Sequence, residues 1–122
     1  MAPEVAALWR WLPIGYVATV LLETPVLWAG LGAAHPARTR LLAAAWLTGV
    51  TYPIVALALP ILLWPRARYT TYVMVAEAFA IAAEMALFRW RWRGTRSDLL
   101  VVALANVISA LIGGMITLGM RF

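Results

Sequence analysis

Residues 101–114 read VVALANVISALIGG, an almost wholly apolar stretch that contains two polar side chains. Asn106 and Ser109 lie three residues apart, so on a helix both point to the same face. The apolar run around them extends over residues 99–120, and about 20 apolar residues suffice for a helix to cross the hydrocarbon layer of a membrane. A polar side chain among lipid tails needs a protein partner. The stretch therefore predicts a transmembrane helix with one polar face turned toward other helices.

Three further apolar runs of similar length occur at residues 11–32, 41–64 and 69–88, and none shows the alternation expected of barrel strands. Of the 122 residues, 65% are hydrophobic and 12% are charged, and the mean hydropathy is +0.87. A soluble domain of this size could not bury so much apolar surface. We predict an all-α integral membrane protein, with residues 1–122 forming a single domain of four transmembrane helices.

The net charge of +5 comes from ten arginines at helix ends or in loops, as is ordinary for membrane proteins. It is therefore no signal for nucleic acid, and we expect no nucleic-acid partner. The chain has no cysteine, no zinc-ligand spacing, no paired nucleophile and base, and no phosphate-binding loop. We expect no catalytic residue, no metal and no cofactor, and hence no enzyme. His35, the one histidine, precedes Pro36 in a loop, where we expect it to be solvated.

The arginines also predict an orientation in the membrane. Two loops, residues 33–40 and 89–98, hold six of them, and the opposite side holds four, including Arg66 and Arg121. This excess favours those loops in the cytoplasm and both termini outside, in the plasma (inner) membrane of a bacterium. We interpret residues 89–96, RWRWRGTR, as an interfacial loop. Aromatic residues mark the two interfaces: Trp9, Trp11, Trp64, Tyr69 and Tyr72 on one side, and Trp28, Trp90 and Trp92 on the other.

The chain contains a candidate internal repeat, because residues 38–51, RTRLLAAAWLTGVT, align with residues 96–109, RSDLLVVALANVIS. Polar positions inside the two helices coincide, and so do positions in the helices that precede them. The pairs are Thr48 with Asn106, Thr51 with Ser109, Glu23 with Glu84, and Tyr16 with Glu77. We predict two tandem helical hairpins, residues 16–53 and 77–111, related by a pseudo-twofold axis along the membrane normal, a symmetry that some transporters use.

Three glutamates lie inside the apolar runs. A charge at the bilayer centre costs about 2.5–3.5 kcal/mol on insertion scales, so such residues usually face the bundle interior. No arginine lies mid-run, so these carboxyls are expected to be protonated or to bind an external cation. We expect Asn106 to find its partner in Glu84. The predicted ion, proton or substrate site comprises Glu23, Glu77, Glu84, Asn106, Ser109, Thr48, Thr51, Tyr52 and Tyr16.

Two functions remain open at this point. The first is a transporter or channel for a proton, a cation or a small cationic solute, functioning as a homodimer because four helices enclose little space. In size, helix count and a glutamate in the first helix, the chain is similar to the small multidrug resistance transporters, which implies a dimer that shares carboxylates. Residues 20–26, VLLETPV, lack that family's motif. The second is an accessory or assembly subunit of a larger membrane complex, with the polar cluster as a helix-packing or partner contact.

Overall fold

The computed structural model describes residues 5–63 and 68–120, and every regular element in these residues is helical. Helix α1 spans Val5–Gly30, α4 spans Tyr69–Trp92 and α5 spans Arg96–Met120. Helix α2 (Ala37–Pro53) continues through the π-helical turn η1 (Ile54–Ala58) into α3 (Leu59–Leu63). Within this part of the chain, α1, the α2–η1–α3 segment, α4 and α5 are each long and apolar enough to cross a membrane. The predicted helical class and the four membrane-length helices are confirmed. Trp64, Arg66 and Arg121 lie outside the described residues.

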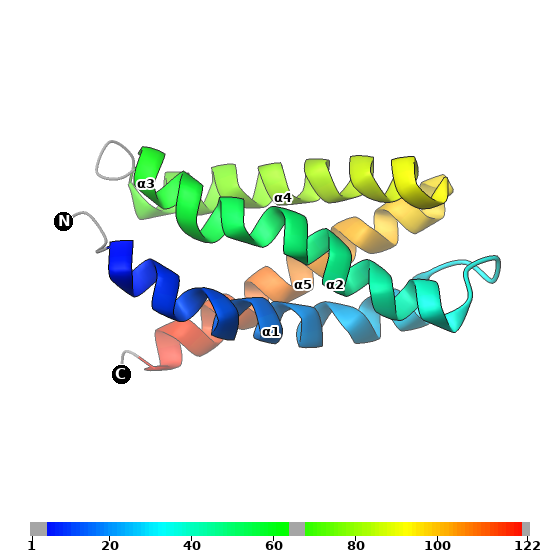
Figure 1. Cartoon of the computed structure of the whole chain (residues 1–122), viewed down its shortest axis with the longest axis horizontal. Coiled ribbons are helices and arrows are strands. Elements are labelled where there is room, and N and C mark those ends of the chain that lie inside the picture. The colour runs from blue at the N-terminus through cyan, green and yellow to red at the C-terminus, as the bar shows by residue number, and fades with distance from the viewer. Residues whose placement is uncertain (1–4, 64–67, 121–122) are drawn as a thin grey trace.

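The helices form an elongated bundle (Figure 1). The start of α1, the start of α4 and the end of α5 lie at one end, which we call the terminus end. The connections 31–36 and 93–95 lie at the other, which we call the loop end. Helices α1 and α4 occupy opposite edges, and α2 and α5 cross each other between them (Figure 1). Helix α1 packs most extensively on α2 and α5, and α4 packs most extensively on α5. Side chains of all four long helices can therefore meet in the interior.

The interior near the loop end is apolar. Eight buried hydrophobic residues from all four long helices pack together there, and Phe88 in α4 has no exposed surface. We call this group the apolar plug, and its members are Leu27, Leu31, Ala43, Ala44, Leu47, Phe88, Val102 and Ala105. The plug separates the loop end from the polar side chains deeper in the bundle.

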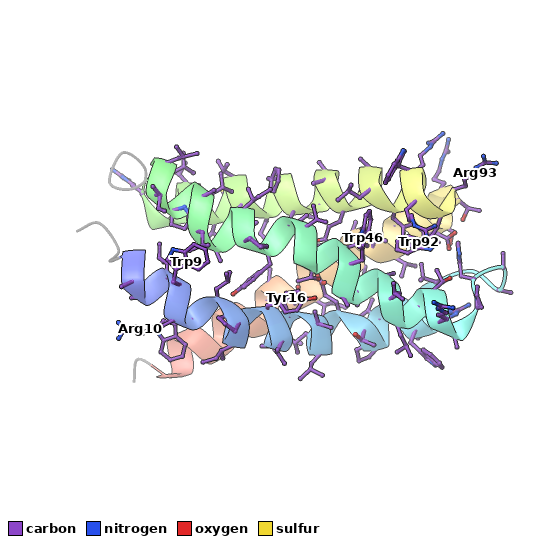
Figure 2. All side chains as sticks on the ribbon, in the orientation of Figure 1. Trp9, Arg10, Tyr16, Trp46, Trp92 and Arg93 are labelled. Carbon is purple, nitrogen blue, oxygen red and sulfur yellow. The ribbon has the colours of Figure 1, made fainter. Side chains whose placement is uncertain are left out.

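Helix α4 extends further than the sequence predicted. The interpretation of residues 89–96 as a loop was wrong in part, because α4 continues to Trp92. The Trp92 ring lies 5.1 Å from that of Phe88 and 5.6 Å from that of Trp46 in α2 (Figure 2), so tertiary contacts hold this last turn. The helix ends at Arg93, which has the left-handed φ of 51°. Gly94 follows because a Cβ there would lie 2.6 Å from the Phe88 ring.

The π-helical turn η1 is stabilised from α4. Its backbone pairs residue i with residue i+5, since the Leu59 N–H reaches the Ile54 carbonyl. The next carbonyl, that of Val55, would need an N–H from residue 60, which is a proline and has none. The Tyr72 hydroxyl donates to this carbonyl instead, at 2.6 Å. This hydrogen bond ties the irregular part of the second span to α4.

Candidate functional site

Glu23 is buried in the bundle interior in the second half of α1, toward the loop end. Only 1% of it is exposed. The Thr48 hydroxyl of α2 donates to its Oε2 at 2.7 Å, and the Ser109 hydroxyl of α5 lies 3.3 Å from its Oε1. The carboxyl of α1 is thus held by one hydroxyl from each of the two helices that cross between α1 and α4.

Glu84 occupies the corresponding place in α4 and is 3% exposed. The Thr51 hydroxyl of α2 lies 2.8 Å from its Oε2, and the Asn106 amide of α5 also hydrogen-bonds this carboxyl. The Asn106 amide donates in addition to the Val102 carbonyl at 3.0 Å. Glu84, like Glu23, therefore takes one partner from α2 and one from α5.

Two of these hydroxyls have a second acceptor within reach. Thr51 Oγ1 lies 3.1 Å from the Leu47 carbonyl, and Ser109 Oγ lies 3.0 Å from the Asn106 carbonyl. A hydroxyl can donate one proton and accept through its lone pairs. Each can therefore donate to an ionised carboxylate, or turn to its own helix and accept the proton of a neutral carboxyl. The surroundings of both glutamates accommodate either protonation state.

A cavity of about 420 Å³ lies beside the cluster, toward the terminus end. Its inner end is polar and is formed by Glu84 with hydroxyl and amide side chains, whereas apolar and tyrosine side chains dominate further out. All four long helices and η1 contribute to its wall. The lining residues are Gly15, Ala18, Thr19, Leu22, Thr48, Thr51, Tyr52, Val55, Tyr72, Val73, Ala76, Glu77, Ala80, Glu84, Asn106, Ser109, Ala110 and Gly113.

The remaining predicted site residues lie at different depths. Glu77 is half-buried and lines the cavity two helical turns from Glu84, on the terminus side. Tyr52 lines the cavity and packs so closely on Gly15 that a Cβ there would collide with its hydroxyl. Tyr16 does not line the cavity, and its hydroxyl donates to the Ala45 carbonyl at 2.7 Å (Figure 2). Tyr16 thus links α1 to α2 outside the cavity.

The sequence analysis missed a second polar cluster, centred on Asp98 at the loop end. Asp98 is 2% exposed and accepts from the backbone N–H groups of Gly32 at 2.8 Å and Thr95 at 3.0 Å. Its other contact is His35 Nε2 at 2.9 Å. The Thr95 hydroxyl in turn accepts from the Asp98 N–H at 3.2 Å, which completes a capping box at the start of α5. We call Asp98, Gly32, His35 and Thr95 the Asp98 cluster.

The expectation of a solvated His35 was wrong, because its side chain is only 11% exposed. Its ring also meets the ring of Phe88 edge to face at 5.4 Å, next to the apolar plug. Arg40 closes the same loop by donating to the carbonyls of Trp28 and Gly32 at 2.7 Å and of His35 at 3.0 Å. The pattern TRSD (95–98) was the signal for the capping box.

The hydrogen-bond partners of Glu23 and Glu84 are hydroxyl and amide side chains. No group of three His, Cys, Asp or Glu side chains in residues 5–63 and 68–120 could hold a metal ion. The cavity lining contains two carboxyls and neither arginine nor histidine. No protein-family model, curated protein or solved structure matches the chain. Its function is therefore inferred from this geometry.

Proposed function

We propose that the chain is an integral membrane protein that moves protons or cations, as a transporter or channel, by means of Glu23, Glu84 and Glu77. One observation carries the proposal: Glu84 is buried and lines a cavity without a basic residue, and the equally buried Glu23 is bonded to Thr48 and Ser109 of the same lining. Each of these two carboxyls has a hydroxyl partner with an alternative acceptor. An ionised carboxylate without a basic partner is costly among apolar helices. A bound proton or cation removes that cost, and exchange between the two is the elementary step of transport.

The surface of the bundle supports membrane insertion. Large apolar side chains on three helices point outward, with Leu21 67%, Met74 68% and Leu100 63% exposed. Such a surface is unusual on a soluble monomer and suits contact with lipid tails. We place the loop end in the cytoplasm because it holds six arginines, among them Arg93, whereas Arg10 lies near the terminus end (Figure 2).

The hydrogen bonds around the two carboxyls support the internal repeat. Each of the two carboxyls accepts one side-chain hydrogen bond from its own predicted hairpin and one from the other hairpin. The within-hairpin contacts are Thr48 with Glu23 and Asn106 with Glu84, and the crossing contacts are Thr51 with Glu84 and Ser109 with Glu23. A half-turn about the long axis of the bundle would exchange α1 with α4 and α2 with α5 (Figure 1). We propose that the hairpins are related by this pseudo-twofold axis.

The proposed site does not need a second copy of the chain. The sequence argument for a homodimer was that four helices enclose little space, but the cavity is lined by the helices of one chain. A dimer would then contain two separate sites. The alternative, an accessory subunit whose carboxyls only hold helices together, requires neither a cavity nor a change of protonation, and the experiment below separates it from transport.

The test is flux into liposomes that contain the purified chain under an imposed potassium diffusion potential, with an enclosed pH-sensitive dye for protons and an enclosed sodium-sensitive dye for cations. We expect Glu84→Gln to slow the flux by about tenfold or more, because the variant keeps the size of the side chain and loses its exchangeable proton. Thr24→Val is the matched control. The Thr24 hydroxyl donates to the Val20 carbonyl in its own helix and lies outside the cavity lining. Equal flux for Glu84→Gln and the native chain would overturn the proposal and favour the subunit function.

A further inference from the structure

The size of the cavity is greater than proton or metal-ion handling requires. Its volume of about 420 Å³ falls within the range of roughly 300–1,000 Å³ that is usual for sites of small organic molecules. A proton needs only a chain of hydrogen bonds, and a metal ion needs a tight shell of ligands. The described residues contain no group of three His, Cys, Asp or Glu side chains that could supply such a shell. The volume therefore points to a polyatomic ligand.

The cavity is also polar at its inner end and mainly apolar further out, where Glu77 is the one carboxyl of the lining. Glu84 lies at the inner end, with its carboxyl held by Thr51 and Asn106. Along α4 the lining continues outward to Val73, which is eleven residues before Glu84 and about 16 Å away along the helix. The wall on the way is formed by small or apolar side chains, including Ala76, Ala80, Leu22 and Val55. A ligand that fits this shape has one polar end and an apolar body.

The charges and aromatic rings of the cavity lining indicate which kind of polar group the ligand carries. Glu84 and Glu77 are the charged residues of the lining, and both are acidic. Tyr52 and Tyr72 also line the cavity, and aromatic faces attract organic cations by about 0.5–2 kcal/mol. An anionic ligand would be repelled by an ionised Glu84, and a neutral ligand would leave the ionised form uncompensated. A cationic head group neutralises it without a metal ion.

We infer that the cavity binds a small organic monocation with an apolar body, such as a substituted ammonium ion. The head group pairs with Glu84, and the body lies against the alanine, valine and tyrosine wall toward the terminus end. Glu77, two helical turns further out, offers the same cation a second carboxyl on its way in or out. This inference rests on the proposed function, for which it names the class of transported solute.

The test is isothermal titration of the purified full chain in detergent with benzyltrimethylammonium chloride. Potassium chloride and benzyl alcohol serve as comparison probes, the first for charge alone and the second for the apolar ring alone. We expect saturable binding of benzyltrimethylammonium, with both comparison probes weaker by about tenfold or more, which corresponds to the loss of one favourable contact. Glu84→Gln is expected to weaken the binding of benzyltrimethylammonium by a similar factor.

A second pair of variants tests the apolar wall. Ala76→Leu fills the cavity without a change of charge, and Ala86→Leu adds the same atoms to an exposed position of the same helix. We expect Ala76→Leu to weaken the binding of benzyltrimethylammonium by about tenfold and Ala86→Leu to leave it near the native value. If Ala76→Leu does not fold, Val73→Phe fills the cavity from a half-buried position and takes its place.

The outcomes separate this inference from the proposed function. Absence of saturable benzyltrimethylammonium binding, while Glu84→Gln still lowers the flux in liposomes, would overturn the inference and leave proton or inorganic cation transport standing. Equal binding by the native chain and Glu84→Gln would overturn it too, because the ligand would then occupy another place. Unchanged flux in Glu84→Gln would instead contradict the proposed function itself.

Discussion

In liposomes, Glu23→Gln is expected to lose proton or cation flux to the same extent as Glu84→Gln, whereas Glu77→Gln is expected to slow it only several-fold. Glu23 and Glu84 are 1% and 3% exposed and are held by side chains of α2 and α5, so water has little room to replace them. Glu77 is half-buried on the cavity wall. Water in the cavity can partly replace Glu77 as an intermediate binding site for a proton.

The initial rate of dye response in the three variants measures this order. Thr48→Val provides a further check, because it removes the hydroxyl that donates to Glu23 at 2.7 Å and leaves the carboxyl in place. We expect it to retain flux with an altered dependence on pH. An equal loss of flux in Glu77→Gln and Glu84→Gln would contradict the proposal that the buried carboxyls matter more than the half-buried one. The essential exchange site would then lie closer to the terminus end.

Asp98→Ala is expected to be among the most destabilising single substitutions in the chain. It removes a buried acceptor from two backbone N–H groups and from His35, and it dismantles the capping box of α5. Hydrogen bonds to a charged group contribute about 1.5–3 kcal/mol each, and loss of a cap about 1 kcal/mol. Because the Gly32 and Thr95 backbones are partly open to water, we expect a total loss of about 2–4 kcal/mol.

Thermal or denaturant unfolding of the detergent-solubilised chain measures the loss. Ser97→Ala, at the neighbouring exposed position, is the matched control and is expected to change stability by less than about 0.5 kcal/mol. His35→Gln is expected to lie between the two, because Asp98 keeps its contacts with Gly32 and Thr95. Equal unfolding of Asp98→Ala and Ser97→Ala would show that the Asp98 cluster does not hold the loop end together.

The fold class could be predicted because length and apolarity alone determine whether a helix can span a membrane. That the polar side chains lie close together could also be predicted from the sequence. Glu23, Glu84, Thr51 and Ser109 each lie on the polar face of an otherwise apolar helix, and such faces turn inward when lipid surrounds the bundle. The structure brings these four side chains together.

The details that the sequence analysis missed depend on tertiary contacts. Trp92 extends α4 because it packs on Trp46, a residue on another helix far away in sequence. The Tyr72 hydroxyl replaces a backbone donor that Pro60 lacks, a compensation between two spans that no local pattern reveals. Asp98 was different, because the capping box TRSD was visible but was counted as part of a charged loop. The cavity follows from the packing of all four helices and could not be foreseen.

Buried carboxyls of α1 and α4 meet side chains of α2 and α5 within one chain. Since the chain has no cysteine, introduced cysteine pairs test this arrangement directly in membranes with a short bifunctional thiol cross-linker. The pairs are Glu23→Cys with Ser109→Cys and Thr51→Cys with Glu84→Cys, with Thr51→Cys and the exposed Ala82→Cys as control. We predict efficient cross-links within one chain for the first two pairs and none for the control. Failure of both pairs, or cross-links only between chains, would contradict it.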